Sequence, residues 1–141
     1  MVIECMPREK ILEIVDYLDA PTLIISISSW GNPIPLYLAE FHINLMHTEF
    51  FNFNDEILEF PIFHSITDED ARRIAKTVKK YQDKVKQIYV HCDAGVSRSA
   101  GVAAAISKYL NNDDFKWFVS PYCPNMTCYT KVLFALNEED Y

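Results

Sequence analysis

The chain has 141 residues, half of them hydrophobic, which suits one compact domain that buries roughly two-thirds of its unfolded surface without metals or disulfides. Its 13 basic and 20 acidic residues give a net charge of −7, which would repel a polyanion and argues against nucleic acid as a partner. We therefore expect residues 1–141 to form a single domain.

The N-terminal segment carries charges where a signal peptide needs an unbroken apolar stretch, at Glu4, Arg8, Glu9 and Lys10. No apolar run approaches the roughly 18 residues of a membrane helix. The sequence thus predicts a cytoplasmic protein without a membrane partner. The four cysteines are too few for a disulfide scaffold and are expected as thiols. Cys123 and Cys128 lack the spacing of a zinc knuckle, so no metal or other cofactor is expected.

Two elements are indicated before residue 30. Pro7 can open a helix that Pro21 ends, with one apolar stripe formed by Ile11, Ile14, Val15 and Leu18. The segment TLIISIS (22–28) is β-branched and almost continuously apolar. Such a composition is typical of a strand that is covered on both faces.

The middle of the chain reads as loop, strand and helix. WGNPIP (30–35) is expected as a loop, and TEFFNF (48–53) as an extended segment that leads into a turn at Asn54-Asp55. Thr67 is expected to cap a helix whose first turn holds Asp68, Glu69 and Asp70. The apolar residues of this helix keep helical spacing up to Tyr81, and its basic residues are expected to face solvent.

The C-terminal part indicates a short buried strand at QIYVH (87–91) and an alanine-rich helix at 97–110 that can sit close to a sheet. A last helix is expected to start near Asn125 and to bury Tyr129, Val132, Leu133 and Leu136. Strands that alternate with helices predict an α/β fold, with a central, mostly parallel sheet flanked by helices. Ligands of such folds bind at the carboxyl ends of the strands.

The segment His91-Cys92-Asp93-Ala94-Gly95-Val96-Ser97-Arg98-Ser99 joins the strand at 87–91 to the helix at 97–110. Cysteine and arginine stand there with five residues between them, a length of loop that can wrap around a tetrahedral anion. The backbone N–H groups of residues 93–98 then point inward, with the helix N-terminus beneath. A buried cysteine before an ordinary helix would not account for the glycine, the serine and the small-residue helix together.

Each side chain in this loop has a use in phosphate chemistry. The helix N-terminus and the ring of N–H donors favour the nucleophilic thiolate form of Cys92. Arg98 offers a planar fork that can hold two phosphoryl oxygens at once. Ser99 can donate a hydrogen bond to the Cys92 sulfur when that sulfur leaves, and His91 is expected to orient the loop through hydrogen bonds.

HCDAGVSRS resembles the signature HCxxGxxR followed by Ser or Thr of the cysteine-dependent protein tyrosine phosphatase superfamily. The short chain resembles its small dual-specificity branch, and the similarity extends over roughly residues 42–139. The resemblance implies a phosphatase with a phosphocysteine intermediate and no metal, acting on a phosphorylated protein or a small phosphomonoester. It also implies an aspartic acid, on a separate loop, that protonates the leaving oxygen and later activates water.

Asp55 is the candidate for this acid, because it follows the end of a strand and its Asn-Asp context resembles the acid loop of the family. The spacing to Cys92 is several residues longer than is usual there, which implies an insertion, for instance within 59–65. Asp68 and Asp70 are nearer to Cys92 but are explained by helix capping, and Glu56 is the nearest substitute.

Other functions remain open at this stage. Rhodanese-like sulfurtransferases and the related cell-cycle phosphatases match the glycine and the Arg-Ser pair less well. Phosphoinositide phosphatases tend to carry lysines in the loop, whereas Asp93 here adds a negative charge. The acidic net charge argues against RNA 5′-phosphatases. From a different class, a module that binds a phosphorylated partner without turnover ranks second.

Overall fold

The computed structural model describes residues 1–55 and 64–138. Within them the chain forms one four-stranded parallel sheet of order β1-β4-β2-β3, whose strands are β1 (Val2–Pro7), β2 (Thr22–Ser28), β3 (Leu45–Asn52) and β4 (Gln87–Cys92). The helices are α1 (Arg8–Ile14), α2 (Asp68–Tyr81), α3 (Arg98–Asn111) and α4 (Met126–Asn137), with the short 3₁₀ helices η1 (Val15–Tyr17), η2 (Leu36–Ala39) and η3 (Phe115–Phe118). The predicted α/β class is confirmed.

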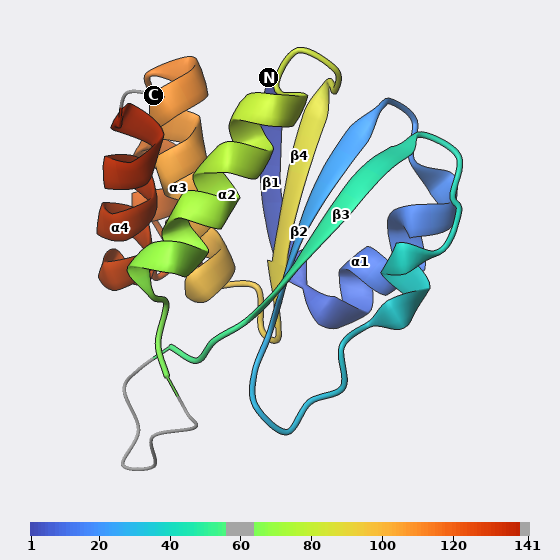
Figure 1. Cartoon of the computed structure of the whole chain (residues 1–141), viewed down its shortest axis with the longest axis horizontal. Coiled ribbons are helices and arrows are strands. Elements are labelled where there is room, and N and C mark those ends of the chain that lie inside the picture. Colours follow the sequence, from blue (N-terminus) through green and yellow to red (C-terminus); the bar gives the residue numbers. More distant parts are fainter. Residues whose placement is uncertain (56–63, 139–141) are drawn as a thin grey trace.

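Helices cover both faces of the sheet: α2, α3 and α4 pack on one face and α1 on the other (Figure 1). All residues of β2 are buried, which explains why its sequence is almost continuously apolar. Leu23, Ile25 and Ile27 join the larger core under α2, α3 and α4, whereas Ile24 joins the smaller core under α1. The strand at 22–28 is thereby confirmed.

The N-terminal region differs from the expectation. Val2–Pro7 forms β1, an edge strand that the sequence analysis did not predict, and it pairs in parallel with β4. The first helix is also shorter than its apolar stripe indicated, because α1 ends at Ile14 and the chain continues as η1. The tighter 3₁₀ turn still brings Val15 into the core, so the stripe is buried without a continuous α-helix.

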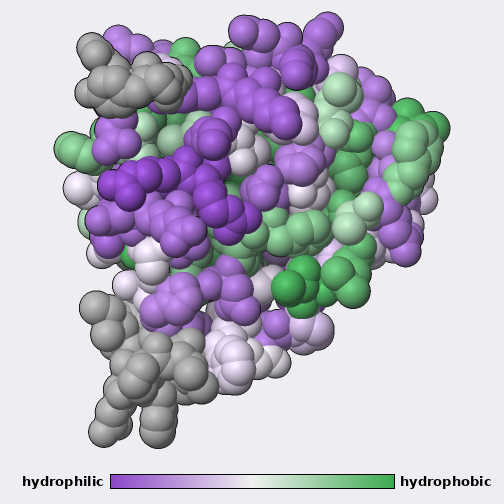
Figure 2. All heavy atoms as spheres, viewed as in Figure 1, coloured by the Kyte–Doolittle hydropathy of each residue, from purple (hydrophilic) through white to green (hydrophobic). Residues whose placement is uncertain are grey.

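α2 begins as its sequence indicated. The Thr67 hydroxyl accepts a hydrogen bond from the backbone N–H of Asp70, and the Asp70 carboxylate accepts one from the backbone N–H of Thr67, both at 3.0 Å. This reciprocal pair satisfies two helix-end donors. Figure 2 shows hydrophilic residues gathered over α2, where Arg72, Lys76 and Lys80 are exposed, as predicted for its basic side.

The small residues of α3 let it lie against the sheet, with α4 close behind it. A Cβ atom added at Gly101 would come within 2.4 Å of the Asn125 carbonyl oxygen, so only glycine permits this approach. α4 starts directly after Asn125, as predicted, and the side-chain oxygen of Asn125 caps it by accepting from the backbone N–H of Cys128 at 3.0 Å. Its fully buried residues are Cys128, Val132 and Leu136, whereas Tyr129 and Leu133 are only partly buried.

Candidate active site

The segment between β4 and α3 lies at the carboxyl edge of the parallel sheet, where ligands of open α/β sheets bind (Figure 1). Cys92 is the last residue of β4 and Arg98 is the first residue of α3. Both side chains are withdrawn from solvent, with exposed fractions of 1% and 4%. Residues 93–97, which we call the phosphate loop, bridge the two.

Gly95 sets the path of the phosphate loop. Its φ of +75° belongs to the left-handed region, and a Cβ atom there would come within 2.3 Å of the Met6–Pro7 peptide. The loop therefore rests directly on the end of β1. The thiol of Cys5, also on β1, donates a hydrogen bond to the Gly95 carbonyl oxygen at 3.3 Å.

The Cys92 sulfur has two hydrogen-bonding neighbours. The backbone N–H of Gly95 donates to it at 3.3 Å, and the buried Ser99 hydroxyl lies 3.1 Å away. Both groups can stabilise a thiolate. Within residues 1–55 and 64–138, the backbone N–H groups of Ala94, Val96, Ser97 and Arg98 donate to no protein acceptor. Such donors at the start of a helix are suited to an anion.

Arg98 is fixed by groups from three segments. Its Nη1 donates to the Ser29 hydroxyl at 2.7 Å and to the Phe53 carbonyl oxygen at 2.8 Å, and its Nη2 donates to Asp93 at 3.1 Å. The Nε atom lies 3.4 Å from Asp55 Oδ2, but it is buried and makes no hydrogen bond within the described residues. A buried N–H without an acceptor is costly, so this edge of the guanidinium is the one suited to an anion.

Asp93 turns its carboxylate toward Arg98 and toward the loop after β2. Oδ2 accepts from Ser29 at 2.7 Å, from Asn32 at 3.2 Å and from Arg98 at 3.1 Å. Partial burial acts to raise the pKa of this carboxyl, but the hydrogen bonds from Ser29 and Arg98 outweigh it and hold the pKa below its ordinary value. The negative charge that the sequence placed in the loop is thus paired with Arg98.

Asp55, the predicted acid, lies beside the phosphate loop. Its Oδ1 accepts a hydrogen bond from the Ser97 hydroxyl at 2.6 Å, and its Oδ2 faces Arg98 Nε. The Asn125 side chain donates to the Asp55 backbone carbonyl at 2.8 Å. The side chain is 44% exposed, so water and a substrate can reach it. The structure therefore brings Asp55, Cys92 and Arg98 to one place.

The other carboxyl groups considered for the acid have different surroundings. Asp70 belongs to the capping box of α2, and Asp68 forms an ion pair with Lys131 of α4 at 3.2 Å. Both are thus engaged at the start of α2. Glu56, and the insertion expected within 59–65 as far as residue 63, lie outside the described residues.

His91 lies beneath the loop and is fully buried. Its Nδ1 faces the Cys92 carbonyl oxygen at 3.4 Å, which can only accept, so Nδ1 carries the proton and Nε2 accepts from the Ser26 hydroxyl at 2.6 Å. Burial lowers the pKa of His91 to about 4. His91 is thus held on both sides as a neutral imidazole, and its role in orienting the loop stays a prediction.

Three residues that contact the candidate site were not predicted from the sequence: Ser29 and Asn32 after β2, and Asn125 before α4. A weak signal existed for Ser29, because a polar residue directly after a buried parallel strand lies at the ligand-binding edge. Asn125 was recognised only as the start of a helix, although its backbone N–H also donates to the Ser97 carbonyl oxygen at 3.0 Å.

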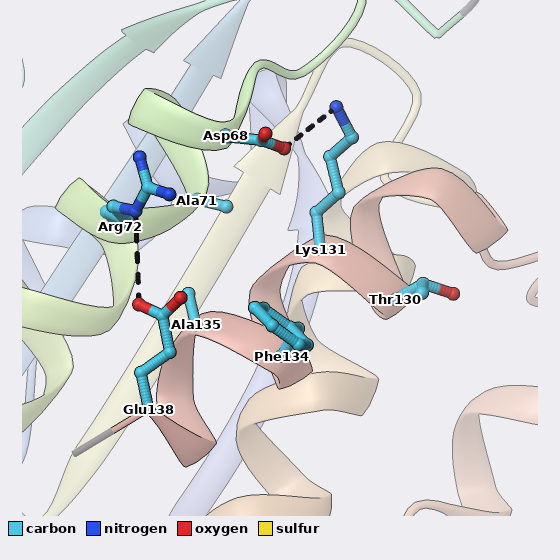
Figure 3. Close-up of a pocket in the computed structure, with 8 residues that line it drawn as sticks. All are labelled: Asp68, Ala71, Arg72, Thr130, Lys131, Phe134, Ala135 and Glu138. Atoms are coloured by element: carbon cyan, nitrogen blue, oxygen red, sulfur yellow. Dashed lines mark ion pairs between the residues drawn. The ribbon is translucent and has the colours of Figure 1, made fainter.

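A cavity of about 200 Å³ lies elsewhere, between α2 and α4 (Figure 3). Ion pairs of Asp68 with Lys131 and of Arg72 with Glu138 flank it, and the exposed Phe134 lines its wall. None of its lining residues belongs to the phosphate loop or contacts Cys92. It is therefore separate from the candidate active site.

The remaining cysteines are free thiols in the structure. Burial raises the pKa of both Cys5 and Cys128 to about 12, which keeps them protonated, whereas Cys123 is exposed. No group of three or more His, Cys, Asp or Glu side chains in the described part of the chain could hold a metal ion. No helix there is long and apolar enough to cross a membrane.

Comparison with solved structures finds the same fold. Tk-PTP in its active form superimposes with a TM-score of 0.57 at 18% identity, covering 95% of this chain and 88% of that one. PTPMT1 in complex with PI(5)P gives 0.54 at 15% identity, covering 96% and 90%, and PTPMT1 alone gives 0.52 at 14%, covering 96% and 89%. Searches of protein-family models and of curated proteins find no match. The chain therefore has the fold of Tk-PTP and PTPMT1, members of the cysteine-dependent protein tyrosine phosphatase superfamily.

Proposed function

We propose that this protein is a cysteine-dependent phosphomonoester hydrolase of the protein tyrosine phosphatase type, with Cys92 as nucleophile. One observation carries the proposal. The Cys92 sulfur accepts from the Gly95 N–H at the base of a loop in which the N–H groups of Ala94, Val96 and Ser97 have no protein acceptor in the described residues. Arg98 and Asp55 lie at the same loop. The fold shared with Tk-PTP and PTPMT1 supports it.

The first step transfers the phosphoryl group to sulfur. The Cys92 thiolate attacks phosphorus in line, the bond from phosphorus to the ester oxygen breaks, and protonated Asp55 gives its proton to that oxygen. The N–H groups of the loop and the Nε–Nη2 edge of Arg98 hold the equatorial oxygens. The products are a phosphocysteine and the dephosphorylated alcohol or phenol.

The second step restores the enzyme. The Asp55 carboxylate takes a proton from water, whose oxygen attacks phosphorus, and the bond from phosphorus to sulfur breaks. The Ser99 hydroxyl, 3.1 Å from the sulfur, donates a hydrogen bond to the departing Cys92 thiolate. Inorganic phosphate leaves, and Asp55 is again protonated for the next cycle.

The substrate that we propose carries a single phosphate, either on a protein or on a small molecule, as in the dual-specificity branch. Residues 93–97 supply no lysine or arginine for a second phosphate. PTPMT1 has been solved with PI(5)P, so a phosphoinositide is the alternative substrate class. The missing basic residues and the net charge of −7 disfavour such a lipid. The charge of Asp93 adds little to this, because it is paired with Arg98. A cytoplasmic location remains part of this proposal.

Turnover of p-nitrophenyl phosphate in the presence of EDTA tests the reaction class. We expect turnover that persists under chelation, inhibition by vanadate, and complete loss in Cys92→Ser with retained binding of phosphate. Cys123→Ser is the matched control, because that thiol is exposed. Activity lost on chelation and restored by a divalent ion would indicate a metallophosphatase. Binding of phosphate by the wild-type protein without any turnover would indicate a phospho-binding module instead.

A further inference from the structure

Asp93 is the centre of a hydrogen-bonded group that the proposed reaction does not use directly. Its Oδ2 accepts from Ser29, Asn32 and Arg98. Ser29 closes the group, because its hydroxyl donates to Asp93 and accepts from Arg98 Nη1 at 2.7 Å. We call Ser29, Asn32 and Asp93 the arginine clamp.

The loop that brings Ser29 and Asn32 is itself attached to the phosphate loop. The backbone N–H of Arg8 donates to the Asp93 carbonyl oxygen at 3.3 Å, and the Arg8 guanidinium donates to the Pro33 carbonyl oxygen. Residues 29–33 are thus tied at both ends to the region around Asp93. The clamp is a part of the packed structure rather than a contact between two free side chains.

The clamp decides which N–H groups of Arg98 remain for a ligand. A guanidinium has five N–H donors. Two on Nη1 go to Ser29 and Phe53, and one on Nη2 goes to Asp93. The two that remain are the Nε–H, which makes no hydrogen bond in the described residues although Asp55 Oδ2 lies 3.4 Å from Nε, and one Nη2–H. By the naming convention, Nε and Nη2 form one edge of the guanidinium, and such an edge can bind a phosphoryl group in a bidentate manner.

We propose that Asp93, held by Ser29 and Asn32, is a positioning residue that turns the Nε–Nη2 edge of Arg98 toward the transferred phosphoryl group. The proposal rests on the proposed function and deepens it by giving the acidic residue of the loop a role. The competing explanation is that Asp93 acts only as a charge. It would then oppose a phosphate dianion at Arg98, and its loss would strengthen anion binding.

Two substitutions separate these explanations, because both remove the charge and only one removes the acceptor. Asp93→Asn keeps an oxygen that can accept from Arg98 and Ser29, whereas Asp93→Ala does not. We expect Asp93→Ala to lower kcat by about 10²-fold, as misplacement of a catalytic group by about 1 Å can, and Asp93→Asn to lose much less. Vanadate affinity should follow the same order. Equal effects of the two variants, or tighter binding of phosphate and vanadate by both, would overturn the proposal.

A double-mutant cycle ties the effect to Arg98. In an Arg98→Ala background, Asp93→Ala should leave vanadate affinity unchanged, since no guanidinium is left to position. An additional loss as large as in the wild-type background would mean that Asp93 acts by another route. Asp83→Ala, at an exposed carboxylate after α2, is the matched control and should change neither kcat nor vanadate affinity.

Spectroscopy and folding controls keep this test separate from that of the proposed function. The ¹H–¹⁵N signal of Arg98 Nε should shift in Asp93→Ala and return toward the wild-type position in Asp93→Asn, and thermal unfolding identifies a variant that does not fold. An unchanged Nε signal in Asp93→Ala would count against the clamp. A wild-type protein that binds vanadate but has no turnover would refute the proposed function and leave the vanadate and Nε measurements decisive for the clamp.

Discussion

Two carboxylates, those of Asp93 and Asp55, approach Arg98 and have different surroundings. Asp93 directs one oxygen, Oδ2, to three donors, one of which is Arg98 itself. Asp55 uses Oδ1 for Ser97 and Asn125, and its Oδ2 faces Arg98 Nε at 3.4 Å without a hydrogen bond. Asp93 is thereby suited to a permanent counter-ion. Asp55 is more exposed and lies beside the phosphate loop, so environment rather than residue type would divide the two proposed roles.

Among the variants that test the difference between the two carboxylates, Asp55→Asn is expected to have the largest effect on the rate. An amide cannot protonate the leaving oxygen, so the rate on a phosphate ester with a poor leaving group should fall by about 10²–10⁴-fold. An activated aryl phosphate needs less help and should lose much less. Steady-state rates on a series of phenyl phosphates of graded leaving-group ability measure this dependence.

Two further variants make the Asp55 test decisive. Asp68→Asn and Glu56→Gln change the other carboxyl groups considered for the acid, and neither should alter the leaving-group dependence. If one of them did so while Asp55→Asn had no effect, the acid would be misplaced, although the assignments of Cys92 and Arg98 would stand.

Arg98→Lys tests the side chain that both carboxylates approach. Lysine keeps the positive charge but cannot donate to Ser29, Asp93 and two phosphoryl oxygens together. We expect kcat/KM to fall by about 10²–10³-fold, nearly as far as in Arg98→Ala. A near-normal rate for the lysine variant would show that Arg98 serves only as a charge, and the distinction between the two carboxylates would lose its basis.

The pH dependence of the free energy of unfolding tests the protonation of His91, near the end of β4. Burial holds the pKa of His91 near 4 in the folded protein, against 6.5 as the ordinary value. The unfolded chain therefore binds the proton more readily between these pH values. His91 should then remove about 3 kcal/mol of stability as the pH falls from 6.5 to 4, and its contribution should be constant above 6.5.

His91→Gln isolates this contribution, because glutamine can keep both hydrogen bonds but does not titrate. Denaturant unfolding at a series of pH values should give a smaller loss of stability on acidification for the variant than for the wild type. Parallel curves for the two proteins would contradict the buried, neutral state of His91.

The smallest effect is expected at a third carboxylate that has no contact with Arg98. Asp70→Asn removes a negative charge from the first turn of α2 and should lower the free energy of unfolding by about 0.3–1 kcal/mol. Because Asp70 contacts Thr67 rather than the phosphate loop, kcat should hardly change. A clear fall in kcat at unchanged stability would extend the site to the start of α2.

Features that depend on contacts within one short segment could be predicted from the sequence. The phosphate loop is one contiguous segment, so the positions of Cys92 and Arg98 at its two ends could be predicted from their spacing. The strand β2 could be predicted from its almost continuous apolar run. The roles of these residues in catalysis stay predictions. The arginine clamp could not be predicted in the same way, since Ser29 and Asp93 are 64 positions apart. β1 was not predicted because its six residues include a charged glutamate and two exposed ends.

Asn125 joins the folding of the last helix to the geometry of the candidate acid. One side chain caps α4 through Cys128 and donates to the backbone of Asp55. Helix ends open locally at a lower free energy than the whole domain, and opening at this end would release the segment that carries Asp55. Activity on poor leaving groups would then decline, reversibly, at temperatures where the sheet is still intact.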